Sequence, residues 1–138
     1  MKFLQTPKST YLLQASLDVL HFESHEWQNE MAFMSDETNF LHKLHLKFME
    51  KILPEKQRTH STELQVKLTQ FSTLLNNIKD DIQAHERYLA NILQNNINVS
   101  DEEYRARHQA VKQQAEYLFN EFKQLKKEFF YWAEDVIS

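Results

Sequence analysis

The sequence predicts an all-α protein, an elongated antiparallel three-helix bundle of coiled-coil-like character. Its 138 residues include no glycine and only two prolines, so tight turns must be few. Apolar residues recur at helical spacing over three long stretches. Only two short segments separate these stretches, so successive helices must run in opposite directions. We expect one domain covering 1–138, with helices at about 8–53, 61–96 and 100–136.

The first predicted helix carries an apolar stripe that repeats every seven residues. Pro7 suits a first helical turn, and Pro54 disfavours a helical residue ahead of it. The stripe keeps its phase throughout, so we expect one continuous helix; a break near Ser35 would give a four-helix variant. Its members are Leu13, Leu20, Trp27, Met34, Leu41 and Phe48.

The other two helices are predicted by stripes that alternate four- and three-residue spacings. The third helix begins with a capping box, in which Ser100 is the N-cap and Glu103 stands three residues on. Such sustained seven-residue periods favour left-handed supercoiling. The second stripe is Leu64, Leu68, Phe71, Leu75, Ile78, Ile82, His85, Leu89, Ile92 and Asn96, and the third is Tyr104, His108, Val111, Ala115, Leu118, Phe122, Leu125, Phe129, Trp132 and Val136.

The composition excludes several classes of function. The chain has no cysteine, which excludes disulfides, zinc–thiolate sites and thiol nucleophiles. The lack of glycine disfavours phosphate-binding loops. The net charge is −4, with no sustained basic stripe, so nucleic-acid binding is disfavoured. No apolar run is long enough for a secretion signal or a membrane span, so we expect a cytoplasmic protein without membrane insertion.

Three glutamates stand where the first helix should be apolar. Glu23, Glu30 and Glu37 also repeat every seven residues. A helical wheel at 100° per residue places them between the main stripe and a second apolar row, with a third apolar row on the far side of the stripe. We therefore expect all three carboxylates to face inward. The second row is Leu12, Val19, Phe33 and Phe40, and the third is Leu17, Met31 and Ile52.

Two histidines interrupt the other stripes, and the three helices should bring them to the glutamates. With turns centred near Gln57 and Asn98, Glu30 falls in one layer with His85 and His108. Glu23 falls in the adjacent layer. Glu37 lies about 10 Å further along, since each helical residue rises 1.5 Å, and should face Asn77 or Ile78 and the region 118–120.

Two interpretations of this cluster follow. The first is a buried Glu–His hydrogen-bond network that fixes helix register, helped by Tyr88 or Tyr104. The second is a metal site for iron, manganese or zinc. The Glu-x-x-His signature of di-iron bundles is missing, because no glutamate in the chain is followed by histidine three places on. The metal-ligand candidates are Glu23, Glu30, His85 and His108.

Other histidines and other chemistry give weaker signals. His21 and His25 have the four-residue spacing of metal ligands, yet the wheel points both away from the apolar arc, which indicates a surface pair. Ser/His/Asp catalysis needs a nucleophile in a pocket with an oxyanion hole, and this sequence offers no candidate. The sequence therefore favours a protein that is not an enzyme.

One stretch resembles a family of small bacterial helical-bundle proteins. The run "LHFESHEWQNEMAFMSDE" (20–37) and the later "IQAHE" (82–86) are similar to that family's Leu-His-x-Glu-His-x-x-Trp-x-x-Glu-Leu-x-Phe-x-x-Asp-Glu and Ala-His-Glu patterns. The chain departs from them at Ser24, where the family has His, and at Met31, where it has Leu. The resemblance implies that Glu23, Glu30 and His85 act as a unit, and it supplies no activity.

The leading functional prediction is a non-enzymatic helical interaction module with a buried Glu/His network. Its partner would be another protein or a second copy of the chain. The alternative is a metal-binding bundle, and a third reading is an enzyme that uses that metal.

Overall fold

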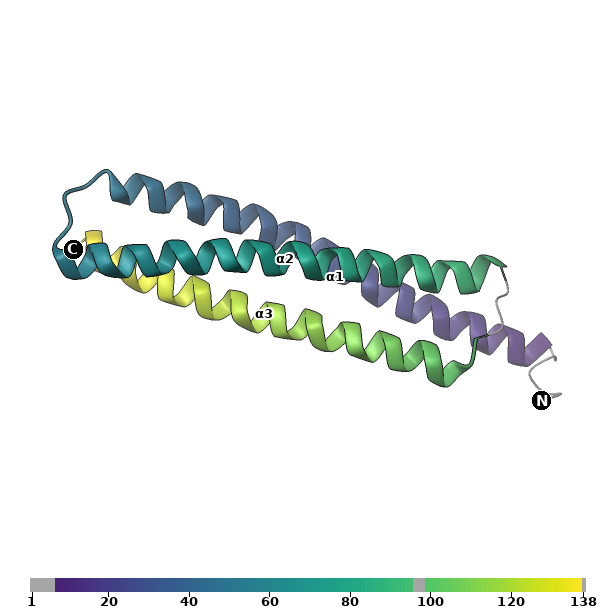
Figure 1. The fold of residues 1–138 in the computed structure, drawn as a ribbon. Helices are drawn as coiled ribbons and strands as arrows, with labels where there is room; N and C mark the ends of the chain where they lie inside the picture. The colour runs from purple at the N-terminus through teal and green to yellow at the C-terminus, as the bar shows by residue number, and fades with distance from the viewer. Residues whose placement is uncertain (1–6, 96–98, 138) are drawn as a thin grey trace.

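The computed structural model shows the three-helix bundle that the sequence predicts. It describes residues 7–95 and 99–137, with side chains from residue 16 onward, and these residues form three helices and no strand. The helices are α1 (Pro7–Met49), α2 (Glu55–Asn95) and α3 (Asp101–Ile137). Figure 1 shows a long rod in which α1 and α3 run in one direction and α2 runs in the other. The start of α1 and the end of α3 therefore lie at opposite ends of the rod.

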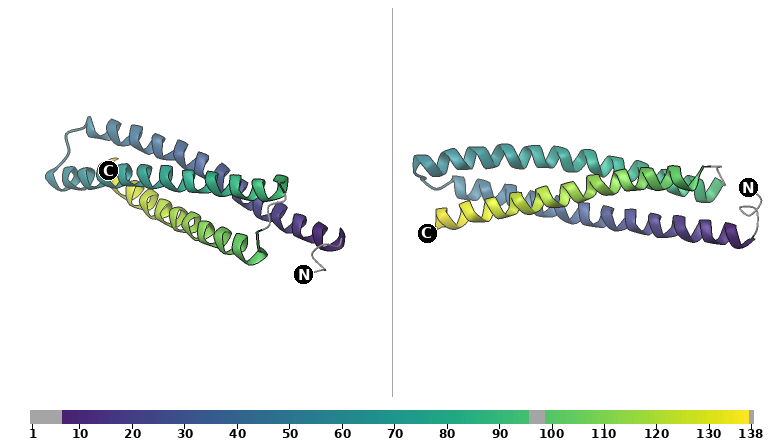
Figure 2. Two further views of the ribbon diagram at one scale, coloured as in Figure 1. Left: turned by 45° about the vertical axis from the view of Figure 1, so that its right-hand side comes forward. Right: turned by 90° about the horizontal axis from the view of Figure 1, so that it is seen from below.

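Helix α1 is continuous over 43 residues, about 65 Å at 1.5 Å per residue. No break occurs at Ser35, which is helical, so the four-helix variant does not form. Figure 2 shows α1 unbroken from two further directions. The constant phase of the seven-residue stripe explains this, because a break would rotate the later apolar residues away from their partners.

The link between α1 and α2 lies earlier in the chain than predicted. Helix α1 ends at Met49 and α2 begins at Glu55, so Gln57 lies inside α2 and not in a turn. The backbone N–H of Arg58 donates to the Pro54 carbonyl at 3.0 Å, which starts the helix directly after the proline. The start of α2 was predicted at residue 61 because the apolar stripe begins nearby, at Leu64. The helix in fact begins about two turns earlier, at Glu55.

The start of α3 is as predicted. The Ser100 hydroxyl accepts a hydrogen bond from the Glu103 backbone N–H at 3.1 Å. This bond satisfies one of the free N–H groups at the helix N-terminus. Asn98, the predicted centre of the second turn, lies outside the described residues.

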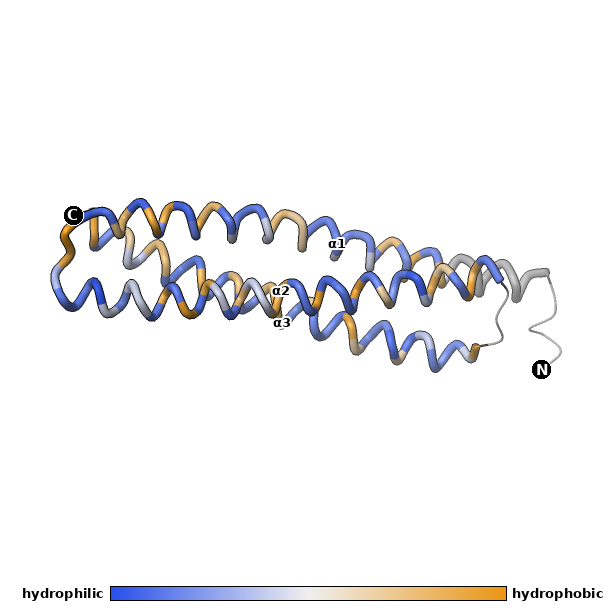
Figure 3. The backbone as a smooth tube through the Cα atoms, turned by 45° about the horizontal axis from the view of Figure 1, so that its top comes forward, coloured by the Kyte–Doolittle hydropathy of each residue, from blue (hydrophilic) through white to orange (hydrophobic). Residues whose placement is uncertain are grey.

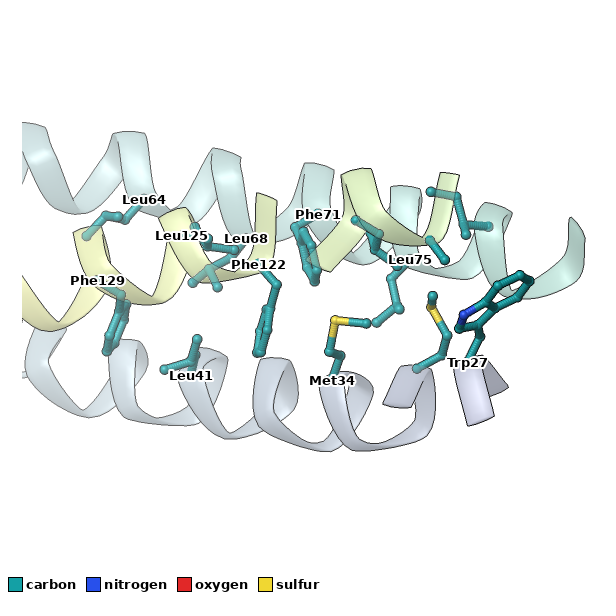
Figure 4. Packing of buried hydrophobic residues seen from close by; sticks show 14 of the residues in the cluster. Trp27, Met34, Leu41, Leu64, Leu68, Phe71, Leu75, Phe122, Leu125 and Phe129 are labelled. Atoms are coloured by element: carbon teal, nitrogen blue, oxygen red, sulfur yellow. The ribbon is translucent and has the colours of Figure 1, made fainter. Parts of the chain in front are cut away.

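The core runs along the axis of the rod and is built from two rows of side chains on each helix. Figure 4 shows Trp27, Met34 and Leu41 of α1 pointing between the other two helices. The predicted stripes of α2 and α3 are buried, except that Val111 and Val136 are half-buried and Asn96 lies outside the described residues. The aromatic members pack on one another, as in the stacked pair Phe71 and Phe122, whose ring centroids are 5.3 Å apart.

The second row of α1 was predicted on the wrong side of the stripe. Val19, Phe33 and Phe40 are exposed, by 63%, 62% and 58%, and Leu12 lies outside the described side chains. The core takes the opposite row, where the predicted Leu17 and Met31 alternate with polar residues. Ile52 of the predicted third row lies in the link and is exposed. The full core row is Leu17, Ser24, Met31, Thr38 and His45, all of them buried.

Hydrophobic residues recur at short intervals along all three helices, with hydrophilic residues between them, as Figure 3 shows. Within the described ranges, no helix combines the length and the apolar character that a membrane span requires.

Candidate functional site

A polar layer divides the apolar core toward the start of α1. It contains one buried residue from each helix: Ser24 from α1, His85 from α2 and His108 from α3. On one side lies the cluster of Leu17, Leu89, Ile92 and Tyr104. On the other side the main core extends from Trp27 to the far end of the rod. The two histidines replace apolar residues in otherwise regular stripes, so the seven-residue period itself places them here.

The two histidines and one glutamate form a hydrogen-bonded chain across the three helices. The Oε1 atom of Glu23 lies 2.9 Å from His108 Nε2, and His108 Nδ1 lies 2.9 Å from His85 Nε2. A carboxylate oxygen accepts, so His108 Nε2–H is the donor and its Nδ1 is an acceptor when the ring is neutral. His85 Nε2–H then donates to His108. The chain therefore sets the tautomer of both rings.

Aromatic stacking holds the same two rings from both sides. Trp27 stacks on His108, with ring centroids 4.8 Å apart and an interplanar angle of 25°. His85 stacks on Tyr88 at 6.0 Å, and the Arg107 guanidinium lies 4.2 Å from the centre of the Tyr88 ring. Such contacts fix ring orientation as well as adding attraction. The column thus ties α1, α2 and α3 together at one level of the rod.

Burial gives His85 an unusual titration behaviour. It lowers the pKa of His85 to about 4, and the nearby charges of His108 and Arg107 act in the same direction. A buried imidazole loses the hydration that stabilises its charged form, and positive charge nearby adds to that penalty. His85 is therefore neutral near pH 7 in the folded protein, and the chain places its one ring proton on Nε2.

Helices α1 and α3 run side by side in a register that is visible in three polar contacts. Ser16 contacts Arg105 and Glu37 contacts Lys126, each pair 89 residues apart in the chain. Glu23 lies 3.9 Å from Lys112 at the same separation. The Glu37 carboxylate is half-buried and receives the Lys126 ammonium at 3.1 Å. Glu37 therefore faces α3 at Lys126, and the predicted surroundings at 77–78 and 118–120 are wrong.

Glu30 does not join the network. The side chain is exposed, with no hydrogen bond or ion pair to the described residues. Glu23 and Glu37 each face a lysine of α3 that stands 89 residues later in the chain. The same separation places Phe119 at the level of Glu30. The predicted layer of Glu30 with His85 and His108 is therefore wrong, while Glu23 and the two histidines do meet.

The α3 sequence held the signal that separates these three glutamates. Lys112, Phe119 and Lys126 repeat every seven residues, as the glutamates do. Matching the two repeats pairs a lysine with Glu23 and with Glu37 and leaves Glu30 opposite an aromatic ring. The wheel of α1 alone carries no information about its neighbour.

A second polar layer lies near the other end of the rod, and sequence reasoning missed it. The buried His45 Nε2 lies 2.8 Å from the Ser61 hydroxyl and 3.1 Å from its carbonyl oxygen. Trp132 packs on this ring at 5.3 Å and donates its indole N–H to the Gln57 carbonyl at 3.1 Å. Burial lowers the pKa of His45, opposed in part by the hydrogen bond to Ser61. Ser24, Thr38 and His45 lie in one row with a seven-residue repeat, in phase with Leu17 and Met31. This spacing was the signal that could have predicted a buried His45.

The predicted metal ligands are brought together only in part. Both ring nitrogens of His108 are engaged in hydrogen bonds, to Glu23 and His85, and Glu30 lies outside the group. The described part of the chain holds no group of three or more His, Asp or Glu side chains placed to hold a metal ion. His21 and His25 reach the surface, as predicted, and both approach Glu86, at 3.8 and 3.5 Å.

Comparison with known proteins adds no relative to this description. No family model, no curated protein and no solved structure matches the chain. The resemblance to small bacterial helical-bundle proteins therefore stays a prediction. The fold and the site define a three-helix bundle with a buried His/Glu network.

The network links all three helices at one level of the rod. Its inner part is a chain of two hydrogen bonds, which runs from Glu23 through both ring nitrogens of His108 to His85. A polar layer of this kind penalises any shift of one helix along another, because a shift would leave buried donors unpaired. The layer therefore fixes which residues of α1 face outward.

Proposed function

We propose that the protein is a non-enzymatic interaction module that binds a protein partner on the outer surface of α1. The observation that carries the proposal is a set of four large apolar side chains exposed between residues 19 and 40 of this helix; Leu46 and Met49, near its end, are exposed as well. Val19, Phe22, Phe33 and Phe40 are exposed by 63%, 65%, 62% and 58%. We call these four residues the outer stripe of α1.

The outer stripe has the geometry of a helix-binding surface. Val19, Phe33 and Phe40 are separated by multiples of seven residues and so lie in one row. Phe22 is three residues from Val19 and lies beside it. The stripe spans about 32 Å at 1.5 Å per residue. Exposed apolar surface of this extent on one face is typical of binding sites.

The stripe sets α1 apart from the other helices. Among the described residues of α2, Val66 is the one exposed large apolar residue. The exposed apolar residues of α3 are tyrosines at positions 117 and 131, with Phe130 and Ile137. Tyrosine keeps a polar hydroxyl in water, whereas the phenylalanines of α1 have none. Helix α1 thus presents one apolar row to the core and another outward.

Three designed peptides test the proposal. Each is an amphipathic helix of about 21 residues, the length of the stripe, with leucines at heptad positions. They differ only in the residues that flank the leucines, which are lysine, glutamine or glutamate. We expect at least one to bind, and the double variant Phe33→Ala, Phe40→Ala to bind about a hundredfold or more weakly, because each buried phenylalanine is worth about 1.5–3 kcal/mol. Fluorescence anisotropy measures both affinities.

The matched control is the double variant Tyr117→Ala, Tyr131→Ala on α3, whose side chains are exposed by 55% and 75%. It should bind like the parent protein. Sedimentation equilibrium on the same samples tests a second copy of the chain as the partner. Should no peptide bind, and should the parent also stay monomeric, α1 is not an interaction surface and the proposal fails.

A further inference from the structure

The outer stripe of α1 lies in a strongly acidic surrounding. The sequence has no lysine or arginine between Lys8 and Lys43, and six Asp or Glu residues in the same stretch. Two of these, Glu23 and Glu37, are neutralised by lysines of α3. The remaining acidic residues of the stretch are Asp18, Glu26, Glu30 and Asp36, all of them exposed.

Three of the carboxylates border the aromatic residues directly. Residues three or four apart are neighbours on a helix surface, so Phe33 lies beside Glu30 and Asp36. Glu26 occupies the row of the stripe itself, seven residues before Phe33. Within the described part of the chain, none of the three carboxylates has a hydrogen bond or an ion pair. Their charge is therefore available to a partner.

We infer that the partner is a basic amphipathic helix, and this rests on the proposed function of α1. Its apolar row would cover Phe33 and Phe40. Lysine or arginine residues on both sides of that row would face the carboxylates of Glu30 and Asp36. The buried part of the contact would be apolar and the rim would consist of ion pairs, the common arrangement in protein interfaces.

The same charges disfavour a second copy of the chain as the partner. Two outer stripes facing each other across a twofold axis would bring the acidic surround of one copy, Glu26, Glu30 and Asp36, against the same acidic surround of the other. Like charges placed opposite one another across an interface weaken it. Glu30 takes no part in the buried network. In this proposal it lies at the rim of the binding surface.

The three peptides described above distinguish the charge of the partner. At low salt we expect the lysine-flanked peptide to bind about tenfold or more tightly than the glutamine-flanked one, since each exposed ion pair contributes modestly. The glutamate-flanked peptide should bind least. The preference should shrink as salt screens the charges.

Two triple variants with the same change in net charge sharpen the test. Glu26→Gln, Glu30→Gln, Asp36→Asn should abolish the preference for lysine. Glu63→Gln, Asp80→Asn, Glu121→Gln, at exposed positions on α2 and α3, should leave it intact. Equal loss in both triples would show attraction to net charge alone and overturn the inference.

The remaining outcomes separate the inference from the proposed function. If the glutamine- or glutamate-flanked peptide binds as tightly as the lysine-flanked one, and Phe33→Ala, Phe40→Ala weakens it, α1 binds helices but the partner is not basic. If the parent is a dimer that this double variant dissociates, the occupant is a second copy, and the inference fails. If nothing binds and no dimer forms, both fail.

Discussion

Lowering the pH from 7 to 4 is expected to reduce the free energy of unfolding by about 3 kcal/mol through His85 alone. The pKa of His85 is lowered from 6.5 to about 4 in the folded protein. The unfolded chain therefore binds the proton first as the pH falls. The stability that neutral His85 provides is fully present above pH 6.5, is lost between 6.5 and about 4, and changes no further below that.

Urea unfolding at several pH values measures this dependence, and the variant His85→Phe isolates the contribution of His85. Asp101 and Glu128, whose pKa values are also lowered by their hydrogen-bond partners, titrate in both proteins and cancel in the difference. The variant should lose stability less steeply than the parent between pH 6.5 and 4. His25→Gln, at an exposed histidine, should follow the parent. Parallel curves for parent and His85→Phe would contradict the account of His85.

Replacing Glu23 by alanine is expected to cost about 1–3 kcal/mol of stability, whereas replacing Glu30 should change it by less than about 0.5 kcal/mol. Glu23 accepts the hydrogen bond of the buried His108 Nε2–H at 2.9 Å, and that donor would be left unpaired. Glu30 is exposed and unpaired within the described residues. Both changes are Glu→Ala in the same helix, so the effect on helix propensity cancels.

Urea unfolding at pH 7 compares the two variants directly. Glu37→Ala gives an intermediate reference, because it removes a half-buried ion pair with Lys126 but no bond to a buried ring. Equal losses for Glu23→Ala and Glu30→Ala would show that the three glutamates act alike, as the sequence pattern by itself suggests, and that the register between α1 and α3 is wrong.

Most of the fold follows from periodicity. The stripes that contain Leu68 and Leu118 repeat without a break, and they predicted the buried positions of α2 and α3 apart from Ser61 and Ala133. The burial of His85 and His108 followed for the same reason, since both stand in phase with apolar neighbours. An apolar repeat that keeps its phase over ten positions identifies the one face of the helix that packs in the core.

The side of α1 that joins the core could not be read in this way. Helix α1 has apolar residues on both sides of its main stripe, and the row with Phe33 and Phe40 is more apolar than the row with Ser24 and Thr38. Hydrophobicity alone selects the wrong row. Contacts with the other two helices decide which row of α1 is buried. Ser61 of α2 contacts His45, and lysines of α3 contact Glu23 and Glu37.

This inversion also leaves the more apolar row of α1 exposed, and the proposed function rests on that exposure. A helix whose more apolar row faces water lowers its own solubility, and α1 keeps three polar residues in the core instead. The polar layers constrain the rotation of α1, because His45 is bonded to Ser61 of α2 and Glu23 to His108 of α3. The outer stripe is therefore held outward by the core, with its carboxylates around it.

The most direct test of this account is to locate a bound basic helix on the protein by NMR. The lysine-flanked peptide is titrated into ¹⁵N-labelled protein, and the backbone amide shifts are followed residue by residue. The largest changes are predicted between residues 18 and 41 of α1, centred on Phe33. Changes centred instead on the groove of about 410 Å³ between α2 and α3, which Lys67, Tyr117 and Glu128 line, or spread over the surface without a centre, would contradict it.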